Sequence, residues 1–231
     1  MSPPVENNST PFVAARWNFE GVLDGITPDS SENENHLTVA GGVSQEFGWV
    51  DMGVLAFNGV DGHASTDSVP IDTTVGFTLA GWFRSHEMPG EFVTAFGVTG
   101  ERESAVTLRF LPCPGQYGWG EWEVSLTDSD GEDAVVTRLS ASEFPSEVGY
   151  WVHVAVVYDR SARALRLYVN GERTAELDFA STPFPPTFRA NGSFQVGRSL
   201  NNGERGECWP GTRWGRPKIF RDEVSRQGLV R

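Results

Sequence analysis

The sequence predicts an all-β protein built as a two-layer antiparallel β-sandwich. About thirteen short stretches are rich in β-branched and aromatic residues, and clusters of Gly, Pro, Asn and Asp separate them. No stretch shows a clear helical period. The chain of 231 residues is long for an average domain, but all-β sandwiches of this size are often single units. We therefore expect one domain over residues 11–231, after a polar, disordered lead-in over residues 1–10.

The clearest strand pattern lies in residues 150–179. Its first strand alternates two kinds of side chain, and a period of two places them on opposite faces. A polar turn over residues 160–163 leads to a second strand over residues 165–169. Asn170 and Gly171 then predict a type I′ turn, because both central residues of that turn need a positive φ. A third strand follows over residues 174–179.

The other strands follow in order along the chain. Residues 12–19 alternate in the same way, and residues 25–35 form a loop rich in acids and turn formers. Residues 77–85 are apolar on both faces, as expected of a central strand in a two-layer sandwich. The last strand should pair near the first. The remaining predicted strands and hairpins are residues 37–43, 54–62, 92–98, 105–111, 121–127, 193–197 and 213–221.

Six short motifs occur in a fixed order along the chain. They are W-N-F-E-G at 17–21, D-S-S-E-N at 29–33, V-L-A-F-N-G-V-D-G at 54–62, F-T-L-A-G-W-F-R-S at 77–85, W-V-H-V-A-V-V-Y-D with L-R-L-Y-V-N-G at 151–171, and S-F-Q-V-G at 193–197. Together they resemble the laminin-G-like domains of the concanavalin-A-like (lectin/glucanase) type, which are common in large bacterial secreted proteins. The resemblance covers about residues 12–225 and implies a jelly-roll fold.

The acidic composition excludes some classes of partner. The formal net charge is −13 and the isoelectric point is about 4.7, which argue against binding nucleic acid or an anionic membrane surface. No run of 18 apolar residues is present, so no membrane insertion is expected. The N-terminus has no signal peptide. The resemblance implies an extracellular or cell-surface location, as part of a larger secreted protein.

The resemblance also implies a structural calcium site in many such domains. Calcium needs six to eight oxygen ligands, and Glu20 and Asp29 stand at matching positions. The last strand departs from the family, because Gly215 and Arg216 occupy the usual acidic positions. We hypothesise that Arg216 replaces the ion by pairing with Asp29 or Glu20, so that no cofactor is required. Two alternatives stay open: Arg216 points to solvent, or calcium binds all the same.

The two cysteines, Cys113 and Cys208, lie in Gly- and Pro-rich segments. By resemblance these segments are loops at the same rim of the sandwich. A disulfide between them is favoured over two free thiols if the protein is extracytoplasmic. It would close a loop of about 100 residues and stabilise the fold by ~4–5 kcal/mol in the chain-entropy model. The four histidines are scattered and show no zinc spacing.

The sequence argues against an enzyme. Glycoside hydrolases on this sandwich use two carboxylates on one strand face. The nearest approach here is Glu121 with Glu123, an i, i+2 pair without a third acid, for which an exposed edge pair is the better interpretation. The chain also lacks the G-x-S-x-G and H-E-x-x-H motifs and any phosphate-binding loop. No catalytic residue is therefore predicted.

Aromatic residues near the two cysteines are the candidate binding residues. Flat aromatic faces stack on sugar rings, and carboxylates and amides bond to sugar hydroxyls, so residues 112–121 and 199–210 form the predicted recognition surface. The alternative for each aromatic residue is that it packs a loop onto the sandwich. The predicted ligand-binding residues are Tyr117, Trp119, Glu121, Trp122, Asn201, Asn202 and Trp209.

Two classes of function stay open at this point. The first is a non-catalytic module that recognises carbohydrate within a larger secreted bacterial protein. The second is a protein-interaction, adhesion or spacer domain of a large surface or toxin-like protein. The fold alone does not decide between them. The partner is expected to be a glycan or a protein, and the module is expected to be a monomer in isolation.

Overall fold

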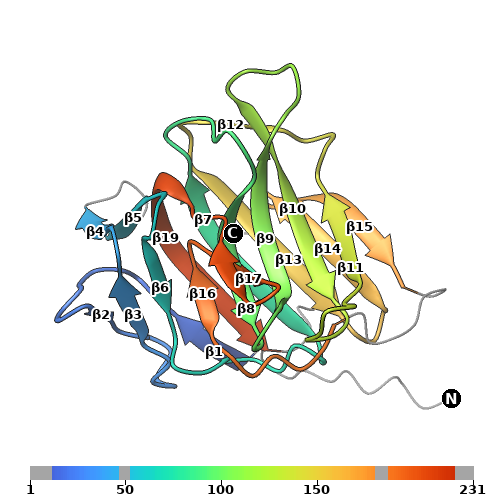
Figure 1. Cartoon of the computed structure of the whole chain (residues 1–231), viewed down its shortest axis with the longest axis horizontal. Coiled ribbons are helices and arrows are strands. Elements are labelled where there is room, and N and C mark those ends of the chain that lie inside the picture. The colour runs from blue at the N-terminus through green and yellow to red at the C-terminus, as the bar shows by residue number, and fades with distance from the viewer. Residues whose placement is uncertain (1–11, 47–52, 180–186, 222–231) are drawn as a thin grey trace, which may run out of the picture.

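The computed structural model describes residues 12–46, 53–179 and 187–221, with the backbone alone for residues 211–221. The described residues form β-strands and no α-helix, so this part of the chain contains no helix that could cross a membrane. Two antiparallel sheets lie face to face around one hydrophobic core (Figure 1). The predicted all-β sandwich is confirmed. The predicted lead-in over residues 1–10 lies outside the described residues.

In the first sheet, neighbouring strands often come from distant parts of the chain. Its strands are β1 (Phe12–Arg16), β4 (Val43–Glu46), β5 (Val54–Asn58), β7 (Phe77–Arg84), β13 (Val152–Asp159), β14 (Ala164–Val169), β15 (Glu172–Asp178) and β19 (Pro210–Arg221). They run in the order β15-β14-β13-β7-β19-β5-β4, and β1 pairs with β19. The predicted pairing of the last strand with the first is therefore confirmed.

The second sheet faces the first across the core. Its strands are β2 (Ile26–Thr27), β3 (Leu37–Ala40), β6 (His63–Ser65), β8 (Val93–Thr99), β9 (Ser104–Pro112), β10 (Trp119–Thr127), β11 (Val136–Ser140), β12 (Ser146–Glu147) and β16 (Phe194–Val196). They run in the order β11-β10-β9-β8-β16-β6-β3-β2, and the two-residue strand β12 pairs with the start of β10. The short strands β2, β6, β11 and β12 were not predicted from the sequence.

Alternation along the strands separates the core from the outer faces. In β13, the residues on one face belong to the core: Val152, Val154, Val156 and Tyr158. In β10, Trp122, Val124 and Leu126 are buried in the same core. Because successive side chains point to opposite faces, Glu121 and Glu123 lie on the outer face of the second sheet.

The predicted Asn170–Gly171 turn joins β14 to β15. Asn170 has a φ of 52° and Gly171 a φ of 87°, so both occupy the left-handed region that a type I′ turn requires. Asn170 also accepts a hydrogen bond from His153 N through its Oδ1 atom, at 3.0 Å. This side-chain bond ties the turn to the neighbouring strand β13.

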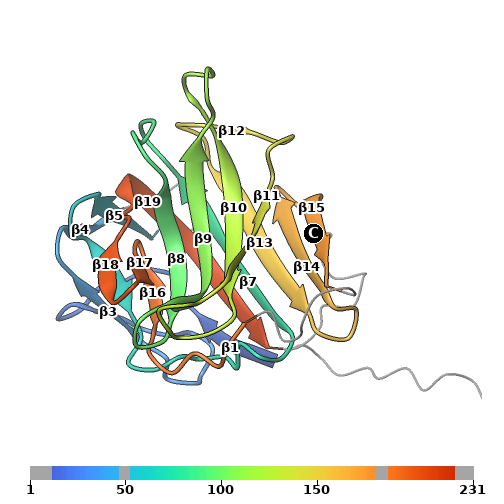
Figure 2. The same ribbon diagram turned by 45° about the vertical axis from the view of Figure 1, so that its right-hand side comes forward.

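A separate hairpin of β17 (Ser199–Asn201) and β18 (Glu204–Gly206) lies across the outer face of the second sheet (Figure 2). Glu207 follows it and forms an ion pair with Arg109 of β9, with 2.9 Å between Oε2 and Nε. The same carboxylate accepts hydrogen bonds from Thr94 of β8 and from Ser199, both at 2.8 Å. These contacts fix the hairpin onto β8 and β9, where the sequence predicts only a loop.

Candidate functional site

The structure keeps part of the predicted recognition surface together at the start of β10. Trp119 pairs directly with Glu147 of β12, so their side chains share the outer face of the second sheet. Glu121 follows two residues later on the same face. Tyr117 lies in the loop between β9 and β10, which stands above the rest of the molecule in Figure 1, and it is 97% exposed. Trp119 is 39% exposed.

Trp122 and Trp209 belong to the core instead. Their side chains are 2% and 0% exposed, and their rings are stacked at 5.8 Å with 19° between the planes. Phe83 and Phe110 contact both rings. The prediction that these two tryptophans contact a ligand is therefore wrong, because no face of either ring is open to solvent. The alternative of packing is correct for both.

Asn201 and Asn202 lie at the opposite end of β9 from Tyr117 and Trp119. Asn202 N donates to Glu103 Oε1 at 2.9 Å, and Glu103 stands immediately before β9. The loop with Tyr117 begins just after the last residue of β9. A strand of this length separates the two loops by roughly 30 Å, at ~3.3 Å per residue. Asn201 and Asn202 therefore do not lie beside Tyr117 and Trp119, as the predicted rim requires.

The predicted disulfide between Cys113 and Cys208 is not formed. Both cysteines are free and half-buried in the structure. Burial raises the pKa of both thiols, and the carboxylate of Glu121 raises that of Cys113 further. The thiol of Cys208 instead lies near Arg198, which lowers its pKa, and near Asp61, which raises it. The two thiols thus have different charged neighbours and do not lie in one loop cluster.

Asp29 has a structural role within the D-S-S loop. Its Oδ1 atom accepts hydrogen bonds from Arg16 N and Ser31 N, both at 2.8 Å. Its Oδ2 atom accepts from Ser31 Oγ at 2.8 Å and from Asn35 N at 3.1 Å. The four acceptor positions of this carboxylate are thus filled by protein donors, which fasten the loop to β1.

This arrangement does not fit a calcium site at Asp29. Glu20, the other predicted ligand, is exposed. Within the described ranges no group of three or more His, Cys, Asp or Glu side chains could hold a metal ion. The side chain of Arg216, and with it the predicted replacement of the ion, lies outside the described residues. That the domain requires no calcium therefore stays a prediction.

Glu121 and Glu123 share a strand face as predicted, but Glu123 is buried rather than exposed. Its Oε1 atom lies 3.5 Å from Arg138 Nε, and its Oε2 atom accepts a hydrogen bond from Ser140 Oγ at 3.1 Å. Arg138 and Ser140 both come from β11, which pairs with β10. These contacts give Glu123 structural partners across the sheet.

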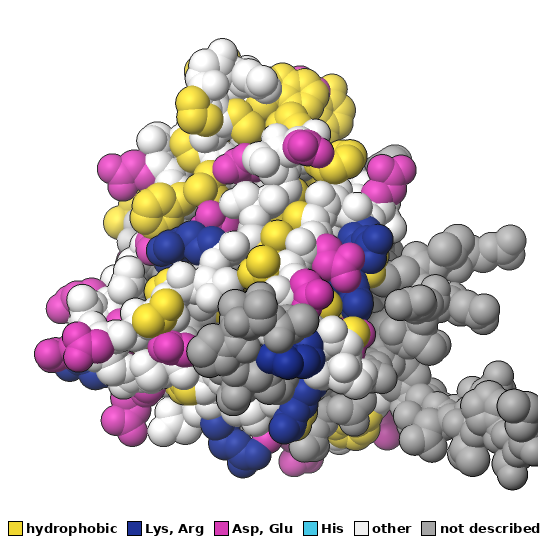
Figure 3. All heavy atoms as spheres, turned by 90° about the vertical axis from the view of Figure 1, so that its right-hand side faces the viewer, with side chains coloured by type: hydrophobic (Ala, Val, Ile, Leu, Met, Phe, Trp, Pro, Cys, Tyr) yellow, Lys and Arg dark blue, Asp and Glu magenta, His cyan; other side chains and the backbone are white. Residues whose placement is uncertain are grey.

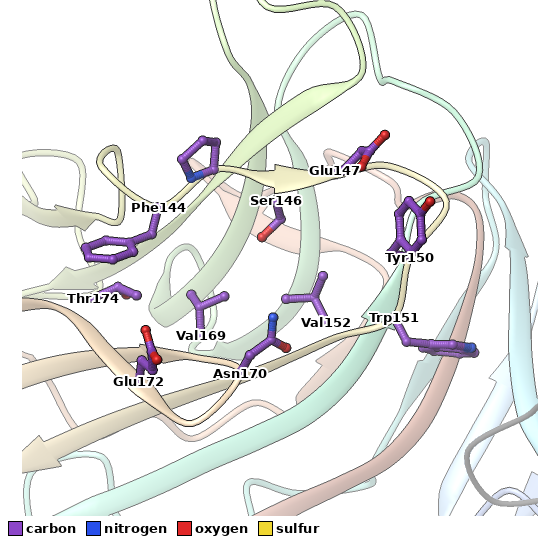
Figure 4. Close-up of a pocket in the computed structure, with 11 residues that line it drawn as sticks. Phe144, Ser146, Glu147, Tyr150, Trp151, Val152, Val169, Asn170, Glu172 and Thr174 are labelled. Atoms are coloured by element: carbon purple, nitrogen blue, oxygen red, sulfur yellow. The ribbon is translucent and has the colours of Figure 1, made fainter.

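A pocket of about 470 Å³ opens between the edges of the two sheets (Figure 4). Residues 144–147 line it from the side of β12, and the β14–β15 hairpin lines it with Val169, Asn170, Glu172 and Thr174. Three backbone hydrogen bonds hold the segment that carries β12. Ala141 N donates to Trp122 O at 2.8 Å, Val148 N to Gly118 O at 2.9 Å and Gly149 N to Ser85 O at 2.6 Å.

The pocket combines two exposed aromatic rings with polar groups. Phe144 and Tyr150 stand at its two ends, while Val152 and Val169 lie between them (Figure 4). Figure 3 shows hydrophobic side chains gathered at this end of the molecule. The exposed large hydrophobic residues at this end include Tyr117, Trp119, Phe144 and Tyr150.

Three side chains offer polar atoms to the pocket. Asn170 Oδ1 accepts from His153 N, so its amide nitrogen points up into the pocket (Figure 4). Ser146 Oγ accepts from Trp122 Nε1 at 3.2 Å, which leaves its own hydrogen as a donor. The carboxylate of Glu172 points in the same direction as the amide of Asn170. Two donors and one strong acceptor therefore converge on the space between the rings.

A small void of about 10 Å³ lies next to the pocket and reaches the core. It shares Ser146, Tyr150 and Val152 with the pocket, and Trp122 and Trp209 also line it. The void has room for about one water molecule. The Nε1 atom of Trp209 is buried and has no hydrogen-bond partner among the described residues. The stacked tryptophans thus lie close behind the pocket.

The sequence reasoning missed this pocket. The sequence predicts that Tyr150 and Trp151 begin a strand and that Asn170 lies in a turn, but neither pattern predicts a pocket. No periodic signal marks the pocket, because it arises where β12 of one sheet approaches the β14–β15 hairpin of the other. The Asn-Gly turn was the one available sign that a polar side chain would lie at that edge.

Comparison with known proteins connects the chain to characterised folds. A family model described as the concanavalin A-like lectin/glucanases superfamily matches residues 58–212. A comparison with curated proteins found no match. Domain 4 of AbnA, an extracellular GH43 arabinanase from Geobacillus stearothermophilus solved in complex with arabinotriose, superposes with a TM-score of 0.64 and 17% identity. That match covers 96% of this chain and 98% of that domain.

Two further structures contain this fold within larger chains. Trypanosoma rangeli sialidase in complex with sialic acid has a TM-score of 0.62 and 15% identity, over 91% of this chain and 31% of the sialidase. The binding domain of botulinum neurotoxin serotype D has a TM-score of 0.63 and 13% identity, over 93% of this chain and 48% of that domain. At these identities the likeness concerns the fold.

Proposed function

The chain belongs to the concanavalin A-like lectin/glucanase superfamily, and we propose that it is a non-catalytic module that binds carbohydrate through the pocket between β12 and the β14–β15 hairpin. The module would act outside the cell, as part of a larger secreted bacterial protein. The match to one domain of an extracellular arabinanase supports this setting. The comparisons support a binding module, and the choice of carbohydrate rests on the pocket.

The observation that carries the proposal is the combination of rings and polar atoms in one concave site. A volume of about 470 Å³ falls within the ~300–1,000 Å³ that ligand sites usually have. Phe144 and Tyr150 present aromatic faces to the apolar side of a sugar ring. Asn170, Ser146 and Glu172 supply donors and an acceptor for hydroxyl groups. Carbohydrate hydroxyls both donate and accept, so this mixed set suits them.

A protein ligand is the second candidate, and a separate observation favours it. Tyr117 is 97% exposed in the β9–β10 loop, outside the pocket. Tyrosine is enriched at protein interfaces because it buries a large apolar ring and keeps a polar end. A protein partner would contact this protruding loop, whereas an oligosaccharide would enter the pocket.

The test measures binding to an oligosaccharide panel by calorimetry for the intact chain and three variants. We expect Phe144→Ala and Tyr150→Ala each to weaken binding by about 10-fold, equivalent to ~1.4 kcal/mol. Tyr117→Ala is the matched control, because it removes an exposed ring outside the pocket, and it should leave binding unchanged. Loss of binding in Tyr117→Ala alone would contradict the proposed pocket and place the sugar site at the β9–β10 loop, and no binding to any oligosaccharide would contradict the proposal and favour a protein ligand.

A further inference from the structure

We infer that the pocket selects uncharged glycans and rejects glycans that carry a carboxylate or sulfate group. The inference rests on the proposed function and names its ligand class. Of the 11 residues that line the pocket, Glu147 and Glu172 carry formal charge, and both are acids. Among the described side chains, no lysine, arginine or histidine lines it. A bound anion would therefore meet negative charge without a counter-ion.

Neighbouring basic residues do not neutralise these two acids. Arg173 follows Glu172 directly, but it forms an ion pair with Glu176, with 2.6 Å between Nη1 and Oε2. Arg166 also pairs with Glu176, through Nε at 2.9 Å. None of the ion pairs between described residues includes Glu147 or Glu172.

Arg84 of β7 lies beside Trp151 at one end of the pocket, but its side chain is on the outer face of the first sheet, because Phe83 next to it points into the core. Its guanidinium stacks on the Trp151 ring, with 5.2 Å to the ring centroid. In Figure 4 the Trp151 ring points away from the other lining side chains. The cation–π contact therefore places this positive charge outside the site, where it cannot serve as a partner for a bound anion.

The geometry of Glu172 explains how the site distinguishes the two classes of glycan. Its carboxylate points into the pocket and accepts hydrogen bonds only, so a neutral sugar can donate a hydroxyl to it in a charge-assisted bond. An anionic group at the same place repels the carboxylate and loses its hydration shell without a cation to replace it. Glu172 and Glu147 are both exposed, so this repulsion acts in a partly aqueous site and depends on close approach of the anion.

The net charge of −13 adds a second repulsion, which acts on an anionic glycan over a longer distance than contact with Glu172 does. Exposed charges separated by more than about 8 Å are largely screened at physiological ionic strength, whereas charges in direct contact lie well inside that distance. Discrimination that comes from contact with Glu172 should therefore be weakened only in part by high salt. Discrimination that comes from the net charge should disappear under the same conditions.

The experiment uses matched glycan pairs, such as lactose with 3′-sialyllactose and xylo-oligosaccharides with and without glucuronic acid. Dissociation constants for the full chain are measured at low and at high salt, together with Glu172→Gln and the control Glu204→Gln. Glutamine keeps the size of Glu172 and removes its charge. Glu204 is an exposed acid on β18, away from the pocket.

We expect the neutral member of a bound pair to bind at least ~10-fold more tightly than the acidic one at low salt, and a smaller preference of the same sign to remain at high salt. Glu172→Gln should reduce this ratio several-fold, and Glu204→Gln should leave it unchanged. Equal or tighter binding of the acidic member, or a ratio that high salt abolishes, overturns the inference while the proposed function stands. If no oligosaccharide binds, the proposed function fails and the inference fails with it.

Discussion

Trp209 and Trp122 behave as a single packing unit. Their stacked rings pack in the core next to Phe83 and Phe110, and they come from two distant parts of the chain. Their neighbours in sequence, Cys208 and Glu121, are not buried. A Gly/Pro-rich sequence around Trp209 is typical of a surface loop, but one buried residue can anchor such a loop to the core. Local composition therefore could not distinguish Trp209 from an exposed residue such as Trp119.

Replacement of Trp209 tests this role. Trp209→Ala should lower the free energy of unfolding by about 3–5 kcal/mol, because it removes a large buried ring and leaves a cavity. Trp119→Ala, at a partly exposed ring, should change it by about 0.5 kcal/mol or less. Urea unfolding followed by circular dichroism measures both. Equal stability of the two variants would contradict the assignment of Trp209 to the core.

Two loops of the second sheet are joined by one carboxylate side chain. Asp130, between β10 and β11, accepts hydrogen bonds from the backbone N atoms of Glu101, Arg102 and Glu103 at 2.7, 2.8 and 2.7 Å. Those three residues connect β8 to β9. Partial burial alone would raise the pKa of Asp130, but the three N–H donors outweigh it and the pKa is lowered.

This lowered pKa gives a prediction about pH. A carboxyl group whose pKa is lower when folded stabilises the protein above its unfolded pKa of about 3.9, and that stabilisation is lost as the pH falls through the folded pKa. Asp130→Asn should therefore be destabilised by about 1–3 kcal/mol at pH 7, and the difference from wild type should shrink below pH 4. Asp133→Asn, at an exposed position, is the control. A difference that stays constant from pH 7 to pH 3 would refute this role.

Elements with a strong local signal were predicted well. The strands over residues 77–84 and 152–159 show clear patterning, and the Asn170–Gly171 turn has its own chemistry. In contrast, the β17–β18 hairpin depends on Glu207, Arg109 and Thr94, which are distant in sequence. A pattern within a short window holds no information on such contacts. The sequence therefore predicted the strands of the two sheets better than the separate β17–β18 hairpin.

For the whole molecule, the candidate site depends on how the sheets meet. Trp119 and Glu121 share one strand face beside Glu147, and Tyr117 lies in the adjoining loop, while their role in ligand binding stays a prediction. The prediction that Asn201 and Asn202 lie at the same rim as Tyr117 was wrong. It depended on which loops meet at which end of the sandwich, and resemblance to a family does not specify this. The pocket could not be predicted at all, since its two walls come from different sheets.

The free cysteines give a prediction for the stability of the whole fold. A disulfide across about 100 residues would add ~4–5 kcal/mol, so a reductant would lower the unfolding midpoint markedly if the bond existed. We expect urea unfolding curves with and without dithiothreitol to coincide. Titration of the unfolded, unreduced protein should give two free thiols per chain. A single large shift with dithiothreitol would contradict the free state of both cysteines.

The position of β19 has a consequence for how the protein is made. This strand, residues 210–221, lies between β7 and β5 and also pairs with β1. While the ribosome is still synthesising it, the nascent chain holds β5 and β7 with no strand between them, and each presents an unpaired edge. Long-range pairing of this kind folds slowly and exposes the chain to aggregation. The first sheet can therefore close only after residues 210–221 have left the exit tunnel, and until then the chain would benefit from a chaperone that shields those edges.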